Sequence, residues 1–401
     1  MELSLTEQVF IGGFIVAVLL GAVVNKTNFC TMGAVSDWIN MGSMARMRAW
    51  VLAMVTALLA VSVIESMQVL SLNATIPSYR TENFAWLRNI VGGLIFGVGM
   101  TLASGCGNKA LIRLGAGNLK SIFVILIAGF FAYLMSKTGF YEMLFHPWVS
   151  ATTVSLNNYS IQGQDIGSFV GAILGAEELG NIRLISSLIV GGLLIAIIFK
   201  SAPFRKDWEN IVAGLGVGAA VVAAWYITGG PLGQEWIEAM EWEEEKPIGV
   251  AVQAYTFINP MGETFFYLMN PTDMLLISFG MVALFGVIVG SFLYAIMSKT
   301  FRIEWFNSWK DFFIHVVGAS MMGIGGVLAM GCTIGQGVTG VSTLSLGSIL
   351  AVSSIIMGSA ITMKTQYYKM VYEDESFMAA FQTALVDLKL LPGSMRKLED
   401  I

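Results

Sequence analysis

Three cysteines are the residues of this sequence whose chemistry and spacing are most distinctive. Cys30, Cys106 and Cys332 lie in FCTMGA, SGCGNK and MGCTIGQG, and no other cysteine occurs among the 401 residues. None of them forms a CxxC pair, so the pattern suits neither a disulfide framework nor a structural zinc site, and we expect no metal or cofactor. A thiol is a weak hydrogen-bond donor and a soft, polarisable contact. Three such groups suit a soft sulfur- or selenium-bearing ion, which they would bind without trapping it.

Glycines surround the three thiols, and glycine lets the backbone approach a ligand closely. Where helices break, unpaired N–H groups and the positive end of the helix dipole are exposed, and several of these pointing into one cavity would attract an anion. The expected substrate path is therefore lined by the three cysteines and by six glycines near them: Gly33, Gly105, Gly107, Gly331, Gly335 and Gly337.

The composition places these thiols in a membrane. Charged residues make up 12 % of the chain and hydrophobic residues 56 %, whereas soluble proteins carry about 25 % charged residues. So few charges cannot solvate the surface of a globule of this size, and we predict an all-α polytopic membrane protein. The net charge of −5 provides no basic footprint for nucleic acid. Because the first residues, MELSLTEQVF, are acidic rather than basic, we expect the first apolar run to remain as a helix.

Nine apolar runs approach the length needed to cross a bilayer, and several are short or rich in glycine. They cover residues 9–24, 50–70, 88–103, 121–135, 184–199, 208–227, 274–297, 312–330 and 344–361. With the N-terminus outside, only five of the 22 Lys and Arg residues fall on the outer side and 17 on the cytoplasmic side. The positive-inside rule therefore predicts the N-terminus outside and the C-terminus inside.

Two stretches of the sequence repeat each other. VGGLIFGVGMTLASGC (residues 91–106) and VGASMMGIGGVLAMGC (residues 317–332) are identical at eight of sixteen positions, with a constant offset of 226. They lie on the third and the eighth span, so they should run in opposite directions. This predicts an inverted-topology repeat, an arrangement in which transporters bind substrate near the midplane. The expected parts are residues 1–136 (first repeat), 137–207 (outer loop and fifth span), 208–363 (second repeat) and 364–401 (cytoplasmic tail).

The Gly-rich segments that follow the cysteines are predicted to be re-entrant, non-helical loops. They are residues 27–37, 107–118 and 333–343, and residues 228–234 (TGGPLGQ) are the expected symmetry mate of the first. Such backbone is tolerated at membrane depth only where it is buried in protein or lines a cavity. Lys109 and Arg113 would either attract an anion at the inner mouth or serve as ordinary positive-inside charges. Glu65 would either couple protons or snorkel to the interface.

The three motifs together resemble those of the YeeE/YedE sulfur-transport family of bacterial inner-membrane proteins. The likeness is carried by FCTMGA, by SGCGNKALIRLGAGNLKS and by GIGGVLAMGCTIGQGVTG, and it covers nearly the whole membrane portion. It implies a pseudo-symmetric helical protein whose re-entrant loops meet at the centre. It also implies uptake of thiosulfate or a related ion relayed by Cys30, Cys106 and Cys332, and a cytoplasmic sulfur-carrier protein of the TusA type as acceptor. The overall form is closest to the YedE branch, which is associated with selenium metabolism, so a selenium species is an alternative substrate.

Two functions follow from these features. The first is an inner-membrane transporter that imports a small sulfur- or selenium-containing anion. The alternative is a membrane thiol enzyme that transfers sulfur or redox equivalents, which would need a thiolate stabilised by a nearby cation. Only Lys109, three residues after Cys106, and Lys26, four residues before Cys30, are close in sequence. With so little to activate a thiolate, we favour the transporter over the enzyme.

Overall fold

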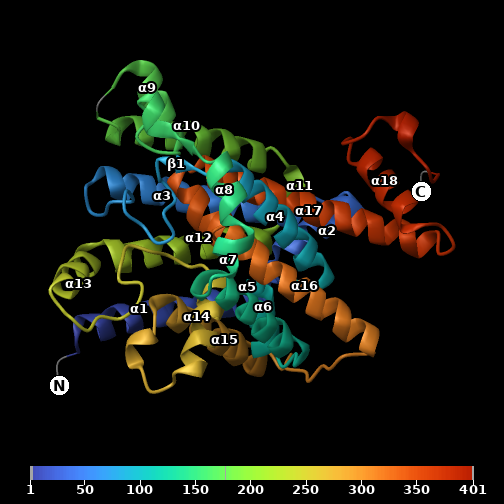
Figure 1. Ribbon diagram of the computed structural model, residues 1–401, viewed down its shortest axis with the longest axis horizontal. Coiled ribbons are helices and arrows are strands. Elements are labelled where there is room, and N and C mark those ends of the chain that lie inside the picture. Colours follow the sequence, from blue (N-terminus) through green and yellow to red (C-terminus); the bar gives the residue numbers. More distant parts are fainter. Residues whose placement is uncertain (1–2, 177, 400–401) are drawn as a thin grey trace.

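The computed structural model describes residues 3–176 and 178–399, and within them the protein is built almost entirely of helices (Figure 1). Nine of the helices in this described part are long and apolar enough to cross a membrane. They are α1 (Leu5–Thr27), α3 (Ala45–Ser66), α4 (Trp86–Leu102), α6 (Lys120–Lys137), α10 (Gly180–Phe199), α12 (Trp208–Gly229), α15 (Phe279–Met297), α16 (Trp309–Leu328) and α17 (Leu346–Val371). The all-α, multi-pass membrane fold predicted from the apolar runs is confirmed.

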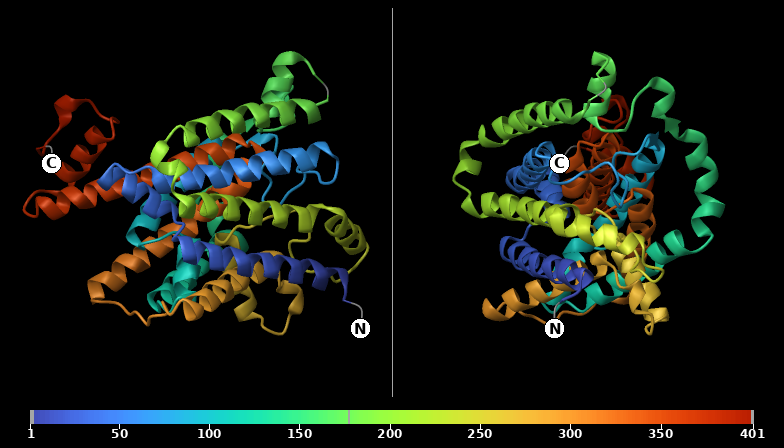
Figure 2. Two further views of the ribbon diagram at one scale, coloured as in Figure 1. Left: turned by 180° about the vertical axis from the view of Figure 1, so that it is seen from behind. Right: turned by 90° about the vertical axis from the view of Figure 1, so that its left-hand side faces the viewer.

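The seventh span begins later than the apolar run suggests. Residues 274–276 form a separate 3-10 turn, and α15 starts at Phe279 because the Ser278 hydroxyl caps it by accepting a hydrogen bond from the amide of Met281. Most of the long helices run roughly along the longest axis of the molecule, and the two termini lie at opposite ends of it (Figures 1 and 2).

Shorter helices connect the spans. They are α2 (Thr31–Met41), α5 (Gly107–Gly115), α7 (Phe140–Leu144), α8 (His146–Thr152), α9 (Ile166–Leu174), α11 (Ala202–Arg205), α13 (Pro231–Glu241), α14 (Ile258–Met269) and α18 (Phe377–Asp387). A two-residue antiparallel pair joins β1 (Asn83–Phe84) to β2 (Val154–Ser155). The tail helix α18 is held against the end of α17, where Asp387 accepts a hydrogen bond from Tyr368 at 2.6 Å and pairs with Lys364 at 3.3 Å.

Helices α4 and α16, which carry the repeated motif, touch through their glycines. A methyl group at Gly92 would lie 2.5 Å from the backbone nitrogen of Ala329, and one at Gly318 would lie 2.5 Å from the backbone nitrogen of Ala103. The two contacts exchange residues at the same offset of 226 that relates the two sequence motifs. Glycine is required at both positions because no side chain fits between the backbones.

The segment expected to mirror the Cys30 loop takes a different form. Residues 228–234 are not an extended break, since α12 continues to Gly229 and α13 begins at Pro231. Proline is well suited to the first position of a helix, where its missing N–H has no partner to lose. In chain order two helices, α13 and α14, lie between α12 and α15, whereas α2 alone lies between α1 and α3.

Candidate functional site

Each of the three cysteines stands at the start of a helical segment. Cys30 caps α2 and its sulfur accepts a hydrogen bond from the amide of Gly33 at 3.4 Å, and Cys106 caps α5. The sulfur of Cys332 likewise accepts a hydrogen bond from the amide of Gly335 at 3.4 Å. The positive ends of three helical segments are therefore directed at the thiols.

The structure corrects the prediction of non-helical loops around and after the three cysteines. Of residues 27–37, only 28–30 lie outside α1 and α2. Residues 107–115 form α5, and residues 335–343 form a π-helical turn followed by a 3-10 turn. The physical reason is the surroundings: backbone groups buried at membrane depth must find partners within the protein, and a helix provides them locally. The glycines that suggested loops serve close packing in these short helices.

The break between the long and the short helix has the same geometry in both motifs. Ser104 and Met330 both adopt left-handed backbone with φ of 58°. The amide of the next residue donates a hydrogen bond to the carbonyl five residues earlier, at 2.9 Å for Gly105 and 2.8 Å for Gly331. This left-handed turn redirects the chain so that the following cysteine opens a new helix.

The structure brings the predicted thiols close to one another. The sulfur of Cys30 interacts with that of Cys106, and the sulfur of Cys106 lies beside the hydroxyl of Thr333, which is the residue next to Cys332. Cys106 and Cys332 are buried, with 2 % and 0 % of their surface exposed, while Cys30 is half-buried. The thiols thus form a series that begins at a partly accessible group and ends at a fully enclosed one.

Three of the six predicted path glycines adjoin polar side chains. A methyl group at Gly33 would lie 2.5 Å from Nη1 of Arg46, and one at Gly335 would lie 2.4 Å from Oγ1 of Thr256. Gly105 lies beside Lys109, with 3.2 Å from the added methyl to its Cβ. Glycine at these positions lets the polar side chains pack directly against the helix backbone.

Two of the other three glycines pack against apolar side chains, and the third adjoins a glutamine. Gly107 packs on Ile258 and Gly337 on Trp50, at 3.0 Å and 2.5 Å from an added methyl, and Gly331 adjoins Gln336 at 3.3 Å. Gly107 and Gly337 therefore allow apolar side chains to approach the helix backbone.

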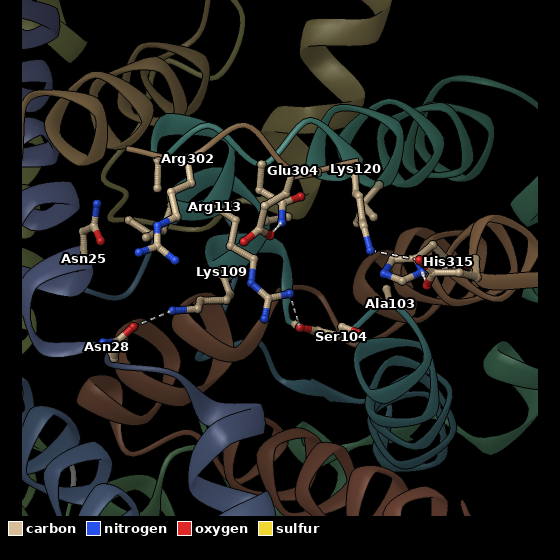
Figure 3. Close-up of a pocket in the computed structure, with 18 of the residues that line it drawn as sticks. Asn25, Asn28, Ala103, Ser104, Lys109, Arg113, Lys120, Arg302, Glu304 and His315 are labelled. Atoms are coloured by element: carbon tan, nitrogen blue, oxygen red, sulfur yellow. Dashed lines mark hydrogen bonds and ion pairs between the residues drawn. The ribbon is translucent and has the colours of Figure 1, made fainter. Parts of the chain in front are cut away.

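A large pocket opens beside α5 and is rich in cations (Figure 3). We call it the cationic vestibule: a cavity of about 600 Å³ whose charged and titratable lining residues are Lys109, Arg113, Lys120, Arg302, Glu304, Asp311 and His315. In Figure 3 the side chains of Lys109, Arg113 and Arg302 point into the same space. A cleft lined mainly by one sign of charge raises the local concentration of the opposite ion.

The cationic vestibule leads to the first thiol. A second cavity of about 280 Å³ is lined by Cys30, Gly33 and Arg46, and it shares Lys109 and Arg113 with the vestibule. Lys109 is held by its Nζ donating to Oδ1 of Asn28 at 3.3 Å, and Arg113 Nη1 donates to the carbonyl of Ser104 at 2.6 Å. An anion in the vestibule would meet two positioned cations before it reached Cys30.

Sequence reasoning raised Lys109 and Arg113 but missed Arg46 and Arg302. Arg46 lies in the first turn of α3, where it pairs with Asp37 at 2.9 Å, and Arg302 lies in the connection between α15 and α16. Both read in the sequence as ordinary positive-inside charges. The place of Arg46 beside Cys30 and that of Arg302 in the cationic vestibule depend on contacts between segments that are distant in the chain.

A third cavity, of about 540 Å³, lies near the other motif. Its lining includes Arg88, His146 and Met330, the left-handed residue that precedes Gly331 and Cys332. Arg88 brings a charge to this side, and in the described residues its buried Nε has no hydrogen-bond partner. Each left-handed break, at Ser104 and at Met330, therefore borders a cavity that contains arginine.

Glu65 has a structural partner. The guanidinium of Arg80 donates to both of its carboxylate oxygens, at 2.5 Å and 2.9 Å, and to the carbonyl of Thr343 at 3.3 Å. A bidentate pair of this kind fixes geometry as well as charge. Arg80 therefore anchors the turn that ends the Cys332 segment to the end of α3.

A neighbouring carboxylate belongs to the same network. Burial alone would raise the pKa of Asp165, but Arg80 and Arg183 outweigh it, so the pKa of this carboxyl lies below its usual value. Arg183 Nε donates to Asp165 at 3.0 Å, and the backbone of residues 164–166 pairs with that of residues 344–346. The network holds the segment after Cys332 in place from outside the spans.

Comparison with known proteins agrees with these features. A family described as sulphur transport matches residues 26–361. A relative named thiosulfate transporter TsuA from Escherichia coli strain K12 is 24 % identical over 370 residues, which cover 88 % of this chain and 93 % of the relative. A protein of the same name from Spirochaeta thermophila is 27 % identical over 289 residues, covering 68 % of this chain and 75 % of the relative.

Proposed function

The chain belongs to the sulphur transport (YeeE/YedE) family, whose members are transporters rather than enzymes, and we propose that it imports a small sulfur anion of the thiosulfate type. Its two TsuA relatives are both named as thiosulfate transporters. The observation that carries the proposal is the series of three thiols, each at the start of a helical segment, that begins beside the cationic vestibule.

The substrate path proposed here runs along Cys30, Cys106 and Cys332. Helix N-termini favour negative charge without placing a full cation in the membrane interior. Thiols contribute weak, soft contacts, so the ion can be passed from one to the next and released. The cations of the vestibule, Lys109, Arg113 and Arg302, attract the anion at one mouth of this path.

The proposed architecture is an inverted repeat. Residues 1–136 and 208–363 form its halves, residues 137–207 connect them and residues 364–401 form a tail. The exchanged contacts of Gly92 with Ala329 and of Gly318 with Ala103 support this arrangement. The 17-to-five partition of the cations supports an N-terminus outside and a C-terminus inside, in the inner membrane of a bacterium. The cationic vestibule would then be the cytoplasmic mouth.

Two finer features of the proposal concern cargo and acceptor. Selenium species resemble sulfur species in charge and softness, so the thiols would also accept a selenium anion. An acceptor such as a sulfur carrier of the TusA type would take up the ion at the cytoplasmic mouth.

The deciding experiment is uptake of labelled thiosulfate into proteoliposomes by the wild type and by Cys30→Ala, Cys106→Ala and Cys332→Ala. We expect each substitution to reduce uptake strongly, because each removes one member of the series. Ser62→Ala is the matched control, since this buried hydroxyl bonds Ser187 at 2.7 Å and lies away from the thiols. Full uptake in all three cysteine variants would refute the relay, and uptake of labelled selenite in parallel would decide the cargo.

A further inference from the structure

Two buried threonine hydroxyls accompany the thiols. Thr333 follows Cys332 directly and lies beside Cys106. Thr256 packs against Gly335, whose amide donates to the sulfur of Cys332 at 3.4 Å. Thr333 is fully buried and Thr256 is 9 % exposed. Within the described residues, neither hydroxyl oxygen has a hydrogen-bond partner.

Other hydroxyls of the same segment are satisfied. The hydroxyl of Thr339 donates to the carbonyl of Tyr255 at 2.8 Å, that of Ser342 to Thr339 at 2.6 Å, and that of Thr343 to Gly340 at 2.8 Å. A buried polar group without a partner costs about 1–3 kcal/mol, so such groups are rare and call for an explanation. Among the described residues the Ser348 hydroxyl also has no partner, and it packs against Gly340, whereas Thr256 and Thr333 lie next to the cysteines.

The surroundings hold Thr256 in place, and its hydroxyl packs closely against the backbone of Gly335. The preceding residue, Tyr255, donates from its hydroxyl to the carbonyl of Gly13 at 2.8 Å and accepts from Thr339 through its backbone. Gly335 has no side chain where a methyl group would come within 2.4 Å of Oγ1 of Thr256. The hydroxyl therefore stands next to a backbone that carries no Cβ.

We propose that Thr256 and Thr333 bind the oxygen atoms of the transported ion while the neighbouring thiols contact its sulfur. The inference rests on the proposed function and specifies its substrate class: an oxyanion that carries a terminal sulfur on the same central atom as its oxygens. Each thiol and hydroxyl pair, Cys106 with Thr333 and Cys332 with Thr256, offers one soft and one hard contact. Each threonine hydroxyl gains a hydrogen-bond partner only when the ion is present, so it contributes to selectivity for an ion that carries oxygen atoms.

The test compares valine, which removes the hydroxyl and keeps the branched shape, with serine, which keeps the hydroxyl. A hydrogen bond to a charged group is worth enough that we expect Thr256→Val and Thr333→Val each to lower kcat/KM for thiosulfate uptake by about tenfold or more. We expect Thr256→Ser and Thr333→Ser to stay within about threefold of the wild type. The matched control is Thr365→Val in α17, which removes a buried hydroxyl bonded to the carbonyl of Ile361 at 2.8 Å and should leave kcat/KM within about threefold. Thr339→Val, which loses the bond to Tyr255 beside Thr256, serves only as a reference for unfolding.

Thermal unfolding of the same purified variants separates binding from structure. Loss of an unpartnered hydroxyl should leave the unfolding temperature unchanged or raise it, whereas Thr339→Val should lower it because it leaves a carbonyl unpaired. Wild-type kcat/KM in both valine variants at positions 256 and 333 would overturn the inference alone, and so would serine variants as impaired as the valine ones. A wild type that takes up no thiosulfate would overturn the proposed function and this inference together.

Discussion

The contact between α4 and α17 allows a stability effect to be worked out in advance. A methyl group at Gly97 would lie 2.2 Å from the carbonyl oxygen of Ile355 and 2.8 Å from the backbone nitrogen of Ser359. Gly192 in α10 is also within a helix, but a methyl group there would have no neighbour within 4 Å. Both Gly→Ala substitutions remove the same backbone entropy from the unfolded chain and gain about 1 kcal/mol of helix propensity. The difference between the two variants is therefore the steric cost alone.

Overpacking of a filled interior costs about 1–3 kcal/mol, and the upper end applies to Gly97→Ala because the obstructing atoms are backbone. We expect Gly192→Ala to unfold at or above the wild-type temperature and Gly97→Ala clearly below it. The assay is thermal unfolding of purified protein in detergent, followed by the fluorescence of its ten tryptophans. Equal unfolding temperatures for the two variants would refute the close packing of α4 on α17.

Two further predictions concern charge. Asp165→Asn should lower the unfolding temperature at pH 7, because the depressed pKa of this carboxyl means that its contribution is present above about pH 4 and is lost as the pH falls through the folded-state pKa; a difference from the wild type that persisted undiminished at pH 3 would contradict this. Arg302→Gln should slow thiosulfate transfer through the vestibule at low ionic strength and approach the wild type in high salt, where screening removes steering. The exposed Lys206→Gln is its control, and an effect independent of salt would count against steering.

The spans were predictable because nothing but length and apolarity decides them. The thiol motifs were predictable in sequence, but their local form was not. Around Cys106, the glycines suggest a non-helical loop, but after the left-handed turn at Ser104 the chain resumes as the helix α5. Local glycine content lowers helix propensity by only about 1 kcal/mol per residue, whereas an unpaired backbone group at membrane depth costs several.

The charged and hydroxyl-bearing parts of the site could not be found from sequence. Arg46 lies near Cys30 and Arg302 lines the cationic vestibule because segments distant in the sequence pack together around α5. No spacing in the sequence relates these arginines to the cysteines. Thr256 gave no signal because a lone threonine in a long connecting segment has no pattern. The sequence offset between Gly92 and Gly318 predicts that the two motifs are related copies. The structure adds that the two motifs lie in contact with each other.

That mutual contact has a mechanical consequence. Since Gly92 and Gly318 each seat against backbone atoms of the opposite helix, shear between α4 and α16 would drive the two main chains into each other. Packed interfaces of this kind move between discrete positions rather than deforming smoothly. We therefore expect the contact between α4 and α16 to stay fixed during transport, with movement confined to the side chains and short helices around it. The ion would then move through a rigid protein. Each transfer would require the rotation of small groups rather than a rocking motion of one half of the molecule against the other.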